Sequence, residues 1–218
     1  MENVAYREEK KVMEEVAGGS MVEGIGGAGA LILSILGLIG AAPLMLASIA
    51  AIGIGGALLV EGGTVGARYS RFLAGTNYDY SNQIIGGGMA MECLGGIAGL
   101  VLGILSLLGI TPMALLPVAV IVFGGALLMA SGAMSRLNSL PIRGMIEPER
   151  AHQMAREAVY VASGSEVLVG AAAVILGILA LSGYHPLVLT LVALLCVGAS
   201  VMLSGTSIAA RMFGIFAH

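Results

Sequence analysis

Four glutamates stand inside long apolar stretches of this chain, and they are the residues whose type and position suggest chemistry. Three of them lie twenty residues before a proline: Glu23 before Pro43, Glu92 before Pro112 and Glu166 before Pro186. The fourth, Glu61, lies eighteen residues after Pro43 and falls at a similar depth in its own apolar stretch. Carboxyl groups in a membrane are costly, so four at one level need partners, water or protons.

The same prolines mark a repeated unit. Twelve residues after each of them comes a glycine: Gly55, Gly124 and Gly198. A period that holds on both sides of a fixed residue indicates a structural repeat. Each unit reads as an apolar helix, a turn from glycine to proline (40–43, 109–112 and 183–186) and a second apolar helix. Glycine can take the left-handed conformation that caps one helix, and proline suits the first position of the next.

The composition predicts an integral membrane protein. Hydrophobic residues make up 58% of the chain and charged residues 11%, whereas a soluble surface needs about a quarter charged residues. Six apolar tracts have about the 20 residues that span a hydrocarbon core of about 30 Å as helix. They are residues 16–40, 43–67, 84–109, 113–135, 158–183 and 187–210. The fold expected is all-α: six transmembrane helices as three antiparallel hairpins in a pseudo-threefold arrangement.

The basic residues indicate the orientation. All ten fall at the termini or in the two long connections, and the three short turns have none. The positive-inside rule then places both termini in the cytoplasm and the protein in the inner, cytoplasmic membrane. The expected organisation is an N-terminal segment 1–15, hairpins 16–67, 84–135 and 158–211, connections 68–83 and 136–157, the second with a short helix, and a tail 212–218.

Two main interpretations of the glutamates remain open. Arg68, Arg136 and Arg211 lie 25, 24 and 25 residues after the hairpin prolines, within reach of the glutamates through long side chains, so the acids could clasp each hairpin shut. Alternatively the glutamates form a ring at the bundle axis. Like charges that are close disfavour each other's ionisation, so such a ring could hold protons or coordinate a cation through oxygen ligands. Placement in a wet interfacial zone is a third interpretation.

The glycines inside the tracts suggest close helix packing. Gly95, Gly99 and Gly103 recur every four residues and share one helical face. Small residues at this spacing let helix backbones approach within a membrane. We expect this face to pack inside the bundle rather than to form a dimer.

The hairpin pattern resembles the HdeD-like short-repeat membrane family of acid-resistance membrane proteins. The likeness is carried by residues 102–112 with 124–132 and by residues 176–186, while the first repeat departs with Ser34 where the others have Gly103 and Gly177. It implies six spans in three hairpins and an association with acid or envelope stress. It carries no defined activity and no motif that includes the glutamates.

Several classes of function lack support in the sequence. No nucleophile and base pair suggests catalysis, and no spacing typical of zinc, di-iron or haem ligands is present, so we expect no enzyme, no cofactor and no metal. The net charge of −3 and the interleaved charges argue against a nucleic-acid partner. Cys93 and Cys196 lie at different depths and are expected to be unpaired.

We therefore expect a non-enzymatic protein in the lipid bilayer. It would act in stress tolerance or as a structural or accessory subunit, as a homo-oligomer or beside a partner membrane subunit. The alternative is a channel or transporter for protons, cations or a small solute that uses the glutamates. The almost wholly apolar outer half favours the first class, because a transport path needs polar groups on both sides of the midplane.

Overall fold

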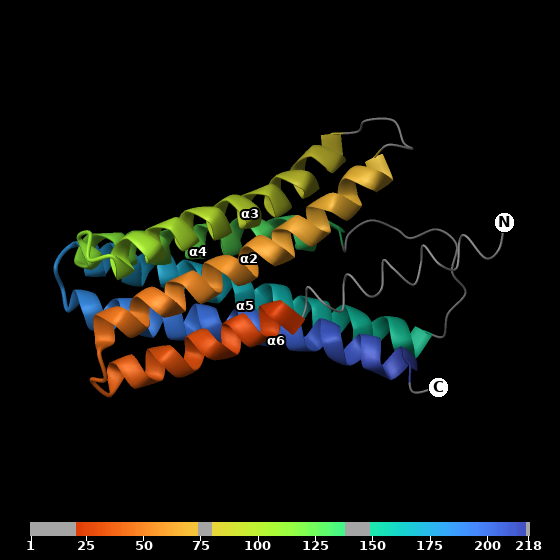
Figure 1. Cartoon of the computed structure of the whole chain (residues 1–218). Coiled ribbons are helices and arrows are strands. Elements are labelled where there is room, and N and C mark those ends of the chain that lie inside the picture. The colour runs from red at the N-terminus through yellow and green to blue at the C-terminus, as the bar shows by residue number, and fades with distance from the viewer. Residues whose placement is uncertain (1–20, 74–79, 138–148, 217–218) are drawn as a thin grey trace.

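The computed structural model describes the backbone of residues 21–73, 80–137 and 149–216 and the side chains of residues 21–62, 91–131 and 165–206. All of the regular structure in these ranges is helical. The first helix is described over Met21–Leu38. It is followed by α2 (Pro43–Leu73), α3 (Tyr80–Leu107), α4 (Pro112–Leu137), α5 (Glu149–Leu181) and α6 (Pro186–Phe216). The helices run side by side, with the three tight turns at one end of the bundle (Figure 1).

Four of these helices are long and apolar enough to cross a membrane among the described residues. They cover Met21–Leu38, Pro43–Gly62, Pro112–Ser131 and Pro186–Thr206. Two shorter apolar segments, Met91–Leu107 and Ser165–Leu181, lie on α3 and α5. The helices α2, α5 and α6 have 31, 33 and 31 residues, so each is about 46 Å or longer and exceeds the hydrocarbon core. Their ends away from the turns extend past the apolar zone.

The observed helix bounds refine the predicted segments. Helix α2 continues to Leu73 and α3 begins at Tyr80, both inside the predicted connection 68–83. Helix α5 is continuous from Glu149, so the helix predicted within residues 136–157 is the first part of α5 itself. The predicted segment 1–15 lies outside the described residues.

The three turns share one geometry. The glycine three residues before each proline has a positive φ: 99° at Gly40, 83° at Gly109 and 87° at Gly183. In the first turn the Ala41 amide donates to the Leu36 carbonyl at 3.1 Å and the Gly40 amide to the Gly37 carbonyl at 3.0 Å, which is the Schellman pattern. The left-handed glycine caps that the sequence predicts are therefore confirmed.

The helices form an inner and an outer set. Fully buried apolar side chains come mainly from α2, α4 and α6, which contact one another, while most exposed large apolar side chains lie on the first helix, α3 and α5. When α2, α4 and α6 are aligned at their first proline, the buried positions that all three share include those 4, 8, 11 and 15 residues later. They are Ala47, Ala51, Ile54 and Leu58 on α2, Leu116, Val120, Phe123 and Leu127 on α4, and Thr190, Leu194, Val197 and Val201 on α6. Alternating steps of four and three make this a coiled-coil seam.

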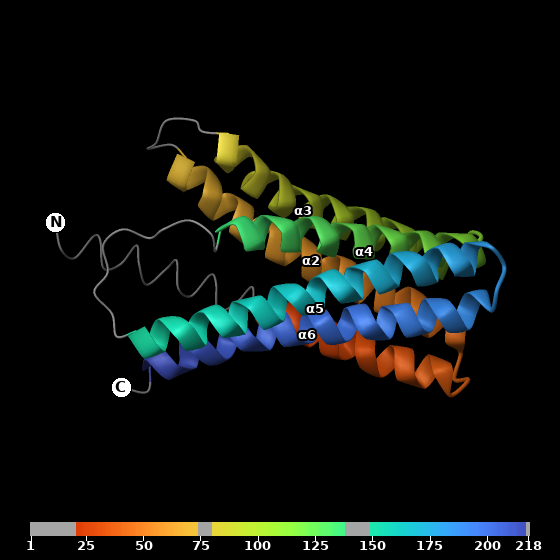
Figure 2. The same cartoon turned by 180° about the vertical axis from the view of Figure 1, so that it is seen from behind.

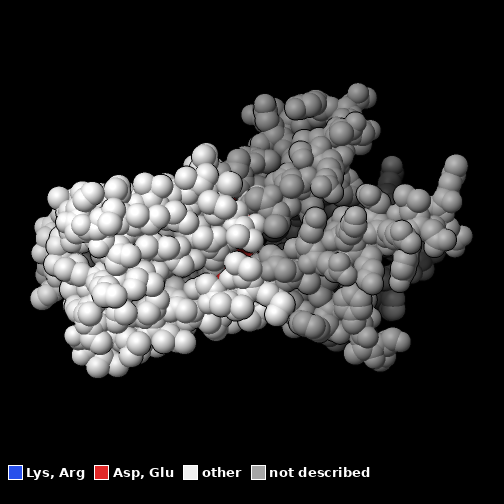
Figure 3. Space-filling view, viewed as in Figure 1, with Lys and Arg blue, Asp and Glu red and all other residues white. Residues whose placement is uncertain are grey.

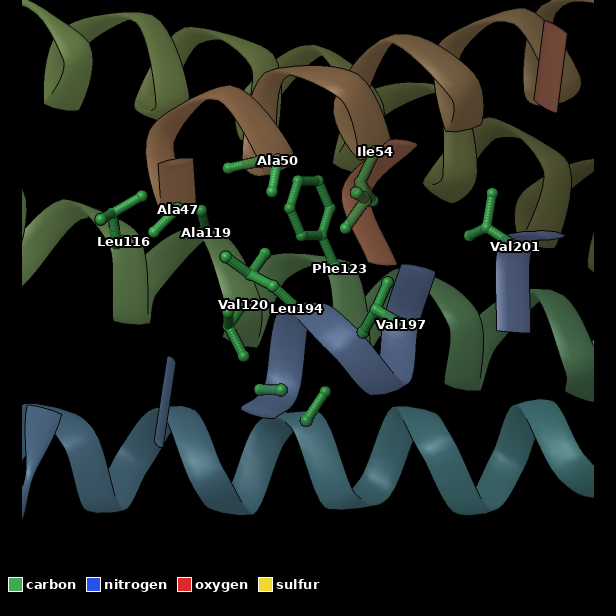
Figure 4. Close-up of a cluster of buried hydrophobic side chains, with 14 of the residues drawn as sticks. Ala47, Ala50, Ile54, Leu116, Ala119, Val120, Phe123, Leu194, Val197 and Val201 are labelled. Atoms are coloured by element: carbon green, nitrogen blue, oxygen red, sulfur yellow. The ribbon is translucent and has the colours of Figure 1, made fainter. Parts of the chain in front are cut away.

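The middle of the seam is filled by one aromatic ring. Figure 4 shows Phe123 between the side chains of α2 and α6, next to Ile54 and Val197. A Cβ at Gly99 of α3 would overlap this ring, so the missing side chain makes room for it. Gly95 faces Ala126 and Gly103 faces Ile52, which confirms that this glycine face packs within the bundle.

Three pairs of helices meet through pairs of glycines. On α2 and α3, a Cβ at Gly55 would lie 2.6 Å from the Leu100 nitrogen, and one at Gly96 would lie 2.7 Å from the Gly55 oxygen. The same relation joins Gly124 of α4 with Gly170 of α5, and Gly198 of α6 with Gly27 of the first helix. The obstructing atoms are backbone, so these helices pack at their closest approach.

Replacing Gly55 or Gly124 with alanine should destabilise the bundle, because the new methyl group meets backbone that cannot rotate away. We expect a loss of about 1–3 kcal/mol in the free energy of unfolding, measured by reversible denaturation in detergent micelles. The adjacent glycines supply matched controls, since a Cβ at Gly56 or Gly125 meets no atom within 4 Å. G56A and G125A should be neutral or stabilising because alanine favours helix. Equal losses at adjacent positions would contradict this packing.

Candidate site: an intramembrane carboxyl cluster

The four glutamates of the apolar stretches come together in the structure. Glu23 lies on the first helix, Glu61 on α2, Glu92 on α3 and Glu166 on α5. The Glu23 carboxyl group is within hydrogen-bonding reach of both Glu61 and the Ser204 hydroxyl of α6, and Glu166 is close enough to interact electrostatically. Glu61 also interacts with Glu92 and Glu166. We call these four residues the carboxyl cluster.

The backbone contacts between hairpins hold the cluster together. Each of Glu23, Glu92 and Glu166 lies four residues, about one helical turn, before the glycine that contacts the neighbouring hairpin. A second close approach lies at the level of the acids themselves, where a Cβ at Gly62 of α2 would be 2.7 Å from the Cys93 nitrogen of α3. The residues that precede these two in sequence are Glu61 and Glu92. Their proximity thus follows from backbone contact.

The cluster is not uniform. Glu23 is 1% exposed, whereas the side chains of Glu61, Glu92 and Glu166 are half-buried. One oxygen of Glu23, Oε1, is fully buried and has no hydrogen-bond partner. A buried polar atom without a partner costs about 1–3 kcal/mol, and more when it carries charge. Glu23 therefore has a buried carboxyl oxygen that lacks a hydrogen-bond donor among the described residues.

The cluster lies at one end of the apolar seam. The next seam position, 18 residues after each proline, is Glu61 on α2, Ala130 on α4 and Ser204 on α6. Between this layer and the turns, the seam is closed by Leu58, Leu127 and Val201, each no more than 4% exposed. Glu61 lies about 27 Å from the start of α2 at 1.5 Å per residue, near the far edge of a hydrocarbon core of about 30 Å. The turn side of the cluster is thus blocked by packed apolar side chains.

The described surroundings offer no positive charge. Residues 21–62, 91–131 and 165–206 contain the four glutamates as their only acids and no lysine or arginine. In Figure 3 the described surface is white except for a small red patch next to the grey residues. The predicted partners Arg68, Arg136 and Arg211 lie on α2, α4 and α6, but their side chains are outside those described. The clasp they would form stays a prediction.

The arrangement limits the chemistry of the cluster. Among the described residues no group of three or more His, Cys, Asp or Glu side chains is placed to hold a metal ion. Cys93 and Cys196 are free thiols, and neither is paired with the other. Four carboxyl groups and one hydroxyl can share protons or attract a cationic group.

The fold and the site define a helical membrane bundle with a carboxyl cluster near one end of its apolar zone. Comparison of the chain with known protein families, with curated proteins and with solved structures finds no match. The geometry therefore carries the functional argument.

Sequence reasoning identified the four glutamates, and it predicts that hydroxyls such as Ser204 bond either to helix carbonyls or across helices. The structure brings Ser204 to Glu23 on another helix. The seam of α2, α4 and α6 was missed. Aligning these helices at their prolines reveals it, because the alignment places Ser204 opposite Glu61 and shows the steps of four and three.

Replacing Ser204 with alanine should weaken the packing of α6 against the first helix, because Glu23 loses a hydrogen-bond donor. We expect about 0.5–1.5 kcal/mol lower stability in detergent micelles. Alanine fits this layer, as Ala130 shows at the matching position of α4. Ser131→Ala is the control: Ser131 is buried, whereas Ser204 is half-buried, and Ser131 donates to the Leu128 carbonyl of its own helix at 2.9 Å. A larger loss in S131A than in S204A would speak against the contact.

Proposed function

We propose that this protein is a six-span bundle of three hairpins around a pseudo-threefold axis, in the inner membrane with both termini cytoplasmic. The support comes from positions that repeat with the prolines: the three turns, the three glycine pairs between hairpins and the layers of the seam. The glycine pairs link the first hairpin to the second, the second to the third and the third to the first. Such a cycle of equivalent contacts is what closed rotational symmetry requires.

We further propose a non-enzymatic role in this membrane, in stress tolerance or as a structural or accessory subunit of a membrane complex, as in the short-repeat family that the chain resembles. The single observation that carries the proposal is the filled axis. Ile54, Phe123 and Val197 are all 0% exposed and meet where a central pore would run. A core packed to this degree serves assembly and stability rather than passage.

The predicted clasp fits within this role. Helix α2 continues through Arg68, seven residues or about 10 Å beyond Glu61, and α4 and α6 continue through Arg136 and Arg211. An arginine side chain is long enough to extend along the helix toward a glutamate and span part of this distance. Each arginine would then hold one inner helix against the carboxyl cluster.

Copurification tests the accessory role. The tagged full-length protein, extracted from its native membrane in a mild detergent, should carry a partner membrane protein in fixed stoichiometry by native mass spectrometry. The control is the G55A variant, whose altered hairpin packing should reduce the yield of the complex, with G56A as its neutral match. A lone protein without partner or ligand in every mild detergent would contradict the accessory role.

A transport role is the second candidate, and the carboxyl cluster is the observation that favours it. Four acids gathered at one level could select protons, cations or a small cationic solute. The apolar seam would then have to open, because its residues block the turn side.

Flux measurements separate the two candidates. Liposomes that contain the protein should show no more proton or cation flux than empty liposomes, because the axis is filled. A triple variant, Glu23→Gln, Glu92→Gln and Glu166→Gln, should behave the same. Flux through the wild type that the triple variant abolishes would overturn the structural role and establish transport.

A further inference from the structure

The three turns form one end of the bundle, as the two opposite views in Figure 1 and Figure 2 show. We call the surface of residues 38–45, 107–113 and 181–188 the turn face. These residues include no Asp, Glu, Lys or Arg, and the end of the bundle that carries the turns is white in Figure 3. A protein surface that stands in water is normally rich in charged side chains. The turn face lacks them.

Large apolar side chains project from the turn face. Four of them, at least one from each turn, are between 50% and 76% exposed: Ile39, Leu108, Ile110 and Tyr184. Removing a side chain of this size from water gains about 1.5–3 kcal/mol. The turn face is therefore unfavourable in water and gains free energy when a less polar medium covers it.

The backbone of the turns meets its hydrogen-bonding needs within the protein. In the second turn the Gly109 amide donates to the Ser106 carbonyl at 2.9 Å. The Ile110 amide donates to the Leu105 carbonyl at 3.1 Å. The other two turns repeat these bonds, and the carbonyl of the residue before each proline accepts an amide of the next helix. Proline itself has no amide to satisfy. Internally bonded backbone is what a lipid environment requires.

The length of the inner helices limits how far the turn face can stand out of a membrane. Arg68, Arg136 and Arg211 lie on α2, α4 and α6, 24 or 25 residues and thus about 36–38 Å from the proline that begins each helix. An arginine is costly inside a hydrocarbon core of about 30 Å. With the arginines outside the core on one side, the prolines reach at most about 8 Å beyond its other edge. This is about the thickness of one headgroup layer.

We propose that the turn face lies in the headgroup layer of the bilayer and binds phospholipid there, so that the bundle presents little surface to the water on that side. The headgroup and glycerol region accepts apolar side chains and polar groups together. Exposed apolar side chains also run without a break from the outer helices into the turn face, as Ile104, Leu107 and Leu108 do at the end of α3. Lipid that covers the outer helices is thus the neighbour that the turn face meets next.

The third turn adds an amphipathic pair. The rings of Tyr184 and His185 meet edge to face, with their centroids 5.0 Å apart and an interplanar angle of 82°. Both side chains are exposed. Rings with an apolar body and a polar tip suit the boundary between a membrane and water, where tyrosine is enriched. The pair anchors the third turn at the depth of the headgroups.

This placement goes beyond the accessory role and does not depend on it. It rests on the membrane-spanning bundle alone. A partner subunit would then meet the bundle within the plane of the membrane or at the end opposite the turns, because lipid covers the turn face.

Tryptophan fluorescence tests the placement, since the chain has no tryptophan and one introduced residue is a unique reporter. Tyr184→Trp and Ile110→Trp place the reporter at exposed positions in the third and second turns. The full chain is reconstituted in phosphatidylcholine vesicles with one of three quenchers: iodide on both sides, a nitroxide on the lipid headgroup or a nitroxide near the end of the acyl chain. We expect the headgroup nitroxide to quench both reporters at least about twofold more strongly than the other two do.

Ile175→Trp is the matched control. Ile175 is exposed on α5, eleven residues before Pro186 and thus about 16 Å from the turn, near the middle of the hydrocarbon core. The acyl-chain nitroxide should quench this variant most. If it does, and iodide or the acyl-chain nitroxide quenches the turn variants at least as strongly as the headgroup nitroxide, the proposal is overturned while the spanning bundle stands. A control that the acyl-chain nitroxide does not quench most would overturn the spanning bundle, and the proposal with it. Either turn variant decides the question if the other does not fold.

Discussion

Backbone contact between glycines is the constraint on which the rest of this structure depends. In a membrane, helix association gains little from the hydrophobic effect, because lipid tails are as apolar as leucine. Close backbone contact between helices comes instead from three glycine pairs: Gly55 with Gly96, Gly124 with Gly170, and Gly198 with Gly27. At this distance dispersion contacts are numerous, and individually weak attractions add up.

The same contacts determine what fills the interior. The outer helices pack closely against α2, α4 and α6, and these three helices contact one another. The seam between them is filled by the side chains at the heptad positions. Large and small residues alternate there, with Phe123 lying over Gly99 and the alanines Ala50 and Ala119 nearby. Among the described residues the acids are found at the last layer, where Glu61 and Ser204 face Glu23.

Much of the helical framework could be predicted from the sequence, because turns and spans depend on local residue types. Gly40, Gly109 and Gly183 cap their helices as glycine before proline indicates. The depth of the four glutamates also followed from counting, since helix rise is constant. Their mutual contact could not be predicted, because it depends on the rotation of each helix, which the glycine pairs set. Depth alone left both pairing with Arg68 and clustering with Glu166 open.

The most informative part of the cluster is where it departs from the repeat. A strict threefold arrangement would place only Glu23, Glu92 and Glu166 in equivalent positions. Glu61 occurs in the first repeat alone, where the other repeats have Ala130 and Ser204. This fourth acid gives Glu23 a hydrogen-bonding partner, and Ser204 adds a donor on the same residue. One residue in one layer thus breaks the repeat, while the seam beneath it stays closely packed.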